Sequence, residues 1–138
     1  LGDDMGFVAW RDVGLNPYGN SVVVNAEYLG KNRALIGKFV KVTQRAFATC
    51  VQDPKPCVQA LVDAGGALKF DNELTNWGLV EVLMSDKYSK GVALGWHDPA
   101  RMQADYALVR DYVGIEKPFD VKSTYTNEFL DRSIKMTK

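Results

Sequence analysis

Apolar residues recur every three or four positions along much of the chain, which is the spacing of amphipathic helices. The longest such stretch predicts a helix over residues 32–52, with Asn32 as its N-terminal cap. Further helices are predicted over residues 56–64, 71–84, 98–114 and 126–134. The dipeptide Asp98-Pro99 supplies a cap and a first helical proline, which is a common way for a helix to begin.

Two shorter apolar segments predict β-strands, at residues 7–10 and at residues 21–25. The second reads Ser-Val-Val-Val-Asn, and because its valines do not alternate with polar residues, we expect this strand to be covered on both faces. The predicted fold class is therefore α/β and helix-rich, with one or two strands and about five helices. A strand with two apolar faces needs neighbours, so exposed or helical valines here would contradict this interpretation.

The composition is that of an ordinary globular protein. Hydrophobic residues make up 46% and charged residues 25% of the 138 residues, and 17 basic residues balance 17 acidic ones. A net charge of zero argues against a nucleic-acid partner that binds the whole chain. No signal peptide is visible before residue 20, and we expect the chain to be a processed or partial one, because its start looks internal.

The sequence gives no positive sign of catalysis, of a bound cofactor or of a metal site. It contains neither a phosphate-binding glycine loop nor a nucleophile motif, and it has one histidine. That residue, His97, stands beside the expected helix cap Asp98, and we interpret it as a surface or half-buried histidine.

Two other features each allow two interpretations. Cys50 and Cys57 either form a disulfide across the Asp-Pro-Lys-Pro turn, in an oxidising compartment, or remain two half-buried thiols. Lys38, Lys41 and Arg45 form either a face that contacts an anion or a nucleic acid or, as we favour, a solvated helix face.

Tyr18 lies in a turn bracketed by proline and glycine, directly before the valine segment, with Asn16 and Asn20 close by. Loops at strand ends line the ligand crevice of open α/β sheets, and an aromatic ring beside amides suits a flat, polar small molecule. The alternative is a tyrosine that only packs against the end of the strand.

Three stretches together resemble the C-terminal part of NMT1/THI5-like solute-binding proteins of ABC importers. They are GLNPYGNSVVVNAEYLGKN, RALIGKFVKVTQRAFATCVQDPKPCVQAL and GWHDPARMQADYALVRDYVGIEKPFDVKSTYTNEFLD. The resemblance implies a type II periplasmic-binding-protein fold, in which two lobes close on a solute. Residues 1–20 would end the second lobe and its hinge crossing, and residues 21–138 would supply the C-terminal strand and helices of the first lobe.

The resemblance also implies a function without catalysis. The solute would be a thiamine pyrimidine precursor or a related nitrate- or sulfonate-type ligand, and Asp12, Asn16, Tyr18 and Asn20 are the candidate ligand-binding residues. The implied partners are a membrane permease and a missing N-terminal half of the same protein, in the periplasm or another extracytoplasmic location. The alternatives are a pyridoxal-phosphate-dependent pyrimidine synthase of the same fold, whose cysteine-rich motif is absent here, and a stand-alone helical interaction module.

Overall fold

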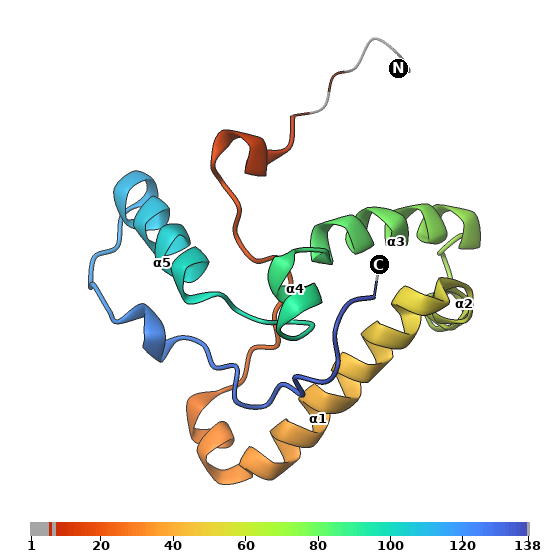
Figure 1. Ribbon diagram of the computed structural model, residues 1–138, viewed down its shortest axis with the longest axis horizontal. Helices are drawn as coiled ribbons and strands as arrows, with labels where there is room; N and C mark the ends of the chain where they lie inside the picture. The colour runs from red at the N-terminus through yellow and green to blue at the C-terminus, as the bar shows by residue number, and fades with distance from the viewer. Residues whose placement is uncertain (1–5, 7, 138) are drawn as a thin grey trace. The chain divides into compact units, whose positions relative to one another are not determined.

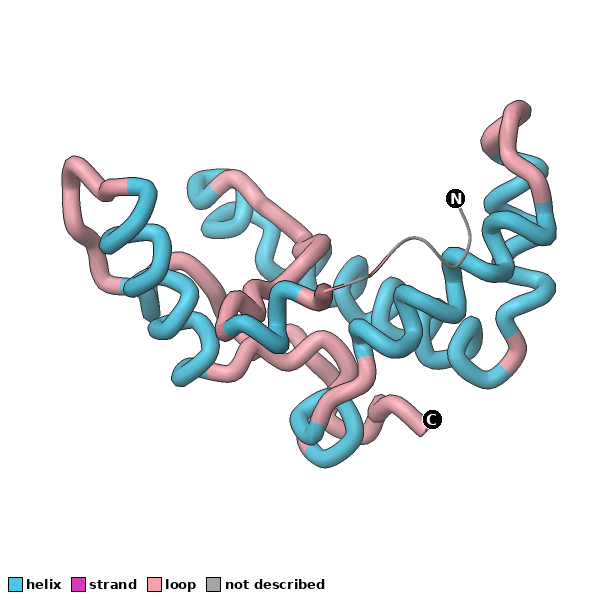
Figure 2. The backbone as a smooth tube through the Cα atoms, turned by 90° about the horizontal axis from the view of Figure 1, so that it is seen from above, coloured by secondary structure: helices cyan, strands magenta, loops and turns pink. Residues whose placement is uncertain are grey.

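The computed structural model describes residue 6 and residues 8–137. These residues form helices joined by loops, and Figure 2 shows no strand among them. Their contacts divide the chain into two units. The first unit contains the described residues up to Ser21 together with His97–Thr126, and the second contains Val22–Trp96 and the described residues from Asn127 onward.

The second unit contains four helices among its described residues (Figure 1). They are α1 (Ala26–Gln52), α2 (Pro54–Ala64), α3 (Phe70–Met84) and the short α4 (Lys87–Gly91). Val51, Leu94 and Met136 form its buried apolar cluster, against which Trp77 and Ile134 pack. This core joins α1, the segment after α4 and the C-terminal segment, which are far apart in the sequence.

Helix α1 begins six residues earlier than the sequence predicts. Asn25 is the cap, because its side-chain oxygen accepts a hydrogen bond from the Tyr28 amide at 3.0 Å. Asn32 is not a cap but a break inside the helix, with φ −129° and ψ 30°, and its side chain donates to the Tyr28 carbonyl. The expected cap therefore marks the place where the helix changes direction, which Figure 1 shows near its start.

Helices α2 and α3 lie where the sequence predicts them, within two residues at each end. Pro54 rather than Pro56 is the first residue of α2, and Gly65 ends it, as expected. The loop predicted between α3 and residue 98 contains α4, which the sequence analysis missed. Asp86 caps α4 by accepting from the amides of Tyr88 and Ser89 in a reciprocal capping box.

The prediction of a last helix over residues 126–134 is wrong. This segment consists of loops and turns, and its backbone is bonded by a side chain of α1. The buried Gln44 donates to the Asp131 carbonyl at 3.0 Å and accepts from the Asp131 amide at 2.9 Å. Phe129 is half-buried and packs against Gly37 of α1. Tertiary hydrogen bonds therefore replace the helical ones that the periodicity predicts.

The first unit is built around α5 (Pro99–Leu108). A single π-helical stretch, η3 (Val109–Val113), continues it to Gly114, whose φ of 96° ends the helix as the sequence predicts. The described residues of this unit also form the 3-10 helices η2 (Trp10–Val13) and η4 (Val121–Ser123). The strand expected at residues 7–10 is not formed at its described positions, where Trp10 begins η2, and Phe7 lies outside the described residues.

The valine segment at residues 21–25 also forms no strand. Val22 is 51% and Val23 92% exposed, so the expected burial on both faces is wrong for this chain. The physical reason is the lack of a pairing strand among the described residues, because backbone groups of a lone extended segment are satisfied by water instead. The described residues are therefore helix-rich, as predicted, but the strands of the predicted α/β class are not formed among them.

The sequence analysis divides the chain into two lobes after residue 20, and the N-terminal part of the first unit ends one residue later, at Ser21. However, the contacts also assign His97–Thr126 to that unit, whereas the sequence analysis assigned all of residues 21–138 to one lobe. The chain therefore passes between the units three times, after Ser21, after Trp96 and after Thr126. The assignment to lobes stays a prediction.

Candidate ligand-binding site

The turn that carries Tyr18 packs against the start of α5, inside the first unit. The Asp98 amide donates a hydrogen bond to the Tyr18 hydroxyl at 2.7 Å. The ring of Tyr18 lies 4.7 Å from the ring of His97, centroid to centroid, at a tilt of 58°. These contacts make Tyr18 a half-buried residue that joins the turn to the helix.

Arg101, in the first turn of α5, contacts the same turn through its guanidinium group. Its Nε donates to the Asn16 carbonyl at 2.6 Å, and its Nη2 donates to Asn16 Oδ1 at 3.1 Å and to the Pro17 carbonyl at 2.9 Å. Its Cζ also lies 3.9 Å from the centre of the Tyr18 ring, in cation–π geometry. The side chain therefore holds three consecutive residues of the turn.

The local sequence explains why Arg101 has this position. Asp98 accepts a hydrogen bond from the Arg101 amide at 3.0 Å and thereby caps α5, as the sequence predicts, and Pro99 fits the first helical position. The cap fixes the first turn of the helix, from which Arg101 projects.

His97 lies where three parts of the first unit meet. Its Nε2 is 3.4 Å from the Ser21 hydroxyl, and its ring lies 5.9 Å from that of Tyr125 as well as against Tyr18. Burial, and after it the positive charge of Arg101, lowers the pKa of His97 from its ordinary value of 6.5. The imidazole is therefore neutral at pH 7, and its expected half-burial is observed.

Asp105, one turn further along α5, completes the charged groups of the cluster. Burial raises the pKa of its carboxyl group, while Arg101 and a hydrogen bond from the Tyr18 amide act in the opposite direction. The cluster thus combines a guanidinium, a carboxyl group, an amide, two phenols and an imidazole. Such groups can bind a planar or anionic polar molecule through hydrogen bonds and ring contacts.

The structure brings together two of the four residues that the sequence analysis selected. Asn16 and Tyr18 both contact Arg101. Asp12 lies in η2, with a side chain that is 68% exposed and 3.9 Å from Arg11, and Asn20 is exposed in the following loop. As described, Asp12 and Asn20 therefore lie outside the cluster.

Sequence reasoning missed Arg101 as a member of this site. Arg101 is 85 residues from Asn16, and no local pattern links the two. The one local signal was the Asp-Pro cap, since it predicts a helix start at which side chains of the first turn can meet a loop.

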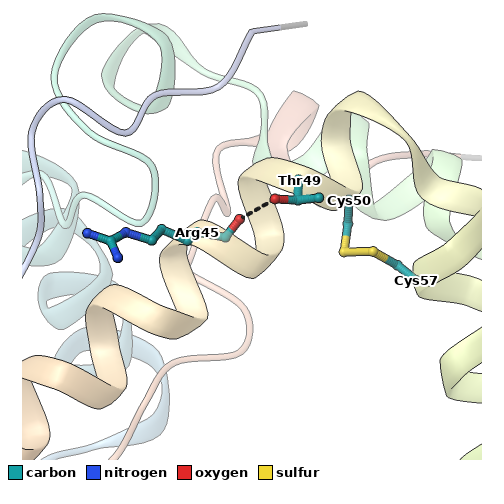
Figure 3. Close-up of a disulfide and its surroundings, with 4 residues drawn as sticks. All are labelled: Arg45, Thr49, Cys50 and Cys57. Atoms are coloured by element: carbon teal, nitrogen blue, oxygen red, sulfur yellow. Dashed lines mark hydrogen bonds between the residues drawn. A yellow bond between two sulfur atoms is a disulfide. The ribbon is translucent and has the colours of Figure 1, made fainter.

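A separate apolar cavity of about 300 Å³ lies in the second unit, between α1, α2 and α3. Phe47 and Trp77 line it, with their ring centres 6.1 Å apart, and so do the two cysteines. The structure joins Cys50 and Cys57 in a disulfide, with their Cα atoms 5.8 Å apart, which connects the end of α1 to α2 (Figure 3).

Lys41 and Arg45, on the basic face of α1, are exposed and lie within electrostatic range of the C-terminal segment of the same unit. Lys41 and Arg45 contribute to lowering the pKa of Asp131, after the larger effect of the hydrogen bonds from Ser133. Part of this face therefore has an acidic partner within the chain, which agrees with its interpretation as an ordinary charged helix face.

Neither a metal-binding cluster of acidic, histidine or cysteine residues nor a helix suited to crossing a membrane is present in the part of the chain that the structure describes.

Residues 1–56 match the family model described as NMT1/THI5 like. The resemblance inferred from the sequence is confirmed over this stretch, which contains all four candidate ligand residues, the valine segment, α1 and Cys50. The match is compatible with a solute-binding role. No curated protein and no solved structure matched the chain.

Proposed function

We propose that this chain is part of the substrate-binding component of an ABC importer, which captures a small polar solute between two lobes without catalysis. The observation that carries the proposal is the family match over residues 1–56. Within that stretch, Asn16 and Tyr18 form a polar and aromatic cluster with Arg101 and His97. Ligand contacts to both lobes would stabilise the closed form, which then docks on a membrane permease.

The chemistry of the cluster favours two kinds of solute. Arg101, whose Nε and Nη2 donate to the turn, supplies a positive charge beside Asn16 and Tyr18, and this charge favours an anion such as nitrate or a sulfonate. Tyrosine and histidine rings beside an amide suit a flat heterocycle such as a thiamine pyrimidine precursor. Solutes of both classes are therefore tested for binding in the same experiment.

The proposal includes a second polypeptide part, the N-terminal half of the same receptor. Exposed Val22 and Val23 are directly followed by α1, on which Leu35, Phe39 and Val42 also remain exposed. A strand followed by a helix with an apolar stripe is the sequence pattern of one α/β unit. We therefore propose that residues 21–25 become a strand when the sheet of the other half pairs with them.

The disulfide supports an extracytoplasmic location, such as the periplasm. Disulfides persist in oxidising compartments and are rare in the cytosol. Cys50 and Cys57 are both engaged in one bridge, so none of the described cysteines is a free thiol.

Thermal unfolding with a solute panel tests the proposal. A pyrimidine, a sulfonate and nitrate are each added at increasing concentration to the receptor with both lobes present. The true ligand stabilises the folded state by about 2.7 kcal/mol at 100 times its Kd, and Tm rises accordingly. The variant Asn16→Ala loses the shift, whereas Tyr112→Ala keeps it, because Tyr112 is 83% exposed and outside the cluster. A panel in which no compound changes Tm contradicts the proposed function.

A further inference from the structure

The contacts of Arg101 are concentrated on one short segment of the chain. Three hydrogen bonds reach Asn16 and Pro17, and the guanidinium plane covers the ring of Tyr18. Two of the three acceptors are main-chain carbonyls, so these bonds set the backbone path of the turn as well as one side chain. Two further hydrogen bonds join this segment to α5 and its cap: the Asp98 amide donates to the Tyr18 hydroxyl, and the Tyr18 amide donates to Asp105.

We infer that Arg101 is a positioning residue, which sets the conformation of the Asn16–Tyr18 turn and so presents Asn16 and Tyr18 to the solute. The part of this inference that concerns the solute rests on the proposed function. The part that concerns the conformation of the turn does not.

The geometry requires a guanidinium group rather than any positive charge. Arg101 donates from two different nitrogens while its plane lies over an aromatic ring. A lysine carries its charge on one nitrogen and has no planar face, so it cannot make these contacts together. The variant Arg101→Lys is therefore expected to keep the charge and lose the order of the turn.

The charge of Arg101 has a separate effect, on His97. The groups described beside this imidazole include Arg101, the phenols of Tyr18 and Tyr125 and the Ser21 hydroxyl, with the Asp98 cap next to it in sequence. Because Arg101 contributes to lowering the pKa of His97, its removal raises that pKa. A residue that only filled space would leave the titration of His97 unchanged.

The test compares Arg101→Met and Arg101→Lys with the control Arg110→Met on the full chain. Arg110 is another arginine of the same unit, but it pairs with Asp111 at the surface. One measurement is amide hydrogen exchange over residues 14–21, where the Tyr18 amide bonds to Asp105. The other is the NMR titration of His97, the single histidine of the chain.

We expect exchange over the turn to become at least about tenfold faster in both Arg101 variants, since each loses several hydrogen bonds. The pKa of His97 rises in Arg101→Met and rises less in Arg101→Lys, because lysine keeps the positive charge. In Arg110→Met neither quantity changes. Wild-type exchange in Arg101→Lys, or equal exchange in Arg101→Met and Arg110→Met, overturns the inference.

Both measurements are made without solute, so they are independent of the proposed function. If exchange is faster in the Arg101 variants but the wild type binds no solute, Arg101 is a positioning residue of the turn and the receptor function is contradicted. Solute binding by the wild type, with unchanged exchange in both Arg101 variants, supports the receptor function and overturns the role of Arg101.

Discussion

Gln44 shows how one buried polar side chain determines the course of a distant segment. It is 5% exposed, donates to the Leu94 carbonyl at 3.0 Å, and both donates to and accepts from the backbone of Asp131. A buried amide with each of its polar atoms bonded stabilises the fold, whereas its removal leaves backbone groups without partners. The C-terminal segment is therefore held by α1 in loops and turns instead of forming its own helix.

Replacing Gln44 by Leu is expected to lower the free energy of unfolding by about 2–3 kcal/mol, because several buried backbone groups lose their partners. Urea denaturation followed by circular dichroism measures the change. The matched control is Gln59→Leu, since Gln59 is exposed on α2 and bonds only to Asp63. Equal stability of the two variants would show that the Gln44 hydrogen bonds contribute nothing net.

The titration of His97 predicts a pH dependence of stability. Its pKa is lowered in the folded state, so as the pH falls below about 6.5 the unfolded chain takes up a proton before the folded one does. The contribution of His97 to the stability is therefore complete above about pH 6.5, and it is lost as the pH decreases through the folded pKa. Thermal unfolding between pH 8 and pH 5 checks this, and the variant His97→Gln is expected to reduce the slope above pH 5.

At the scale of elements, the disulfide gives a direct prediction about the α1–α2 connection. The two cysteines are 7 positions apart, and closing so short a loop stabilises a protein by about 2.5 kcal/mol in the chain-entropy model. The double variant Cys50→Ser, Cys57→Ser is expected to lose about that amount in urea denaturation. Reductant should destabilise the wild type to the same level and leave the double variant unaffected.

The cap of α1 gives a second prediction at this scale. Asn25 bonds the Tyr28 amide, so Asn25→Ala is expected to cost about 1 kcal/mol in unfolding free energy. Asn72→Ala is the control, because Asn72 lies exposed inside α3, where alanine favours the helix. If both variants are equally stable, Asn25 is not the effective cap.

The elements that the sequence predicted correctly are those with local start or stop signals. Asp98-Pro99 begins α5, and Gly65 and Gly114 end their helices. Helix α4 was missed because five residues are too few for a periodic pattern, although its capping residue Asp86 is local. The last predicted helix failed for the opposite reason, because its periodicity was overridden by the hydrogen bonds of Gln44.

The same difference between local and distant information applies to the candidate site. The turn around Tyr18 was found because proline, glycine and asparagine mark it in the sequence. Arg101 and His97 were not, since their contacts to Asn16, Tyr18 and Ser21 cross more than seventy residues. No rule of sequence spacing links residues so far apart, so the cluster can be found only from the folded structure.

At the scale of the whole molecule, the second unit buries few apolar residues relative to those it leaves exposed. Leu35 and Phe39 are each 54% exposed and Val42 is 63% exposed, and they lie on one face of α1 at i, i+4 and i+7. Soluble monomers seldom expose an apolar stripe of this kind unless it is an interaction surface.

We therefore expect the isolated chain to self-associate as its concentration rises. Sedimentation velocity measures this, and binding of the dye ANS reports the exposed apolar surface. Phe39→Asp should shift the chain toward monomer and weaken ANS binding, because a charge at the centre of the stripe opposes apolar contact. Tyr112→Asp, at an exposed aromatic residue outside the stripe, should change neither quantity. A wild type that stays monomeric and binds no ANS would instead indicate a self-contained helical module, and it would contradict the proposal that another part of the protein covers α1.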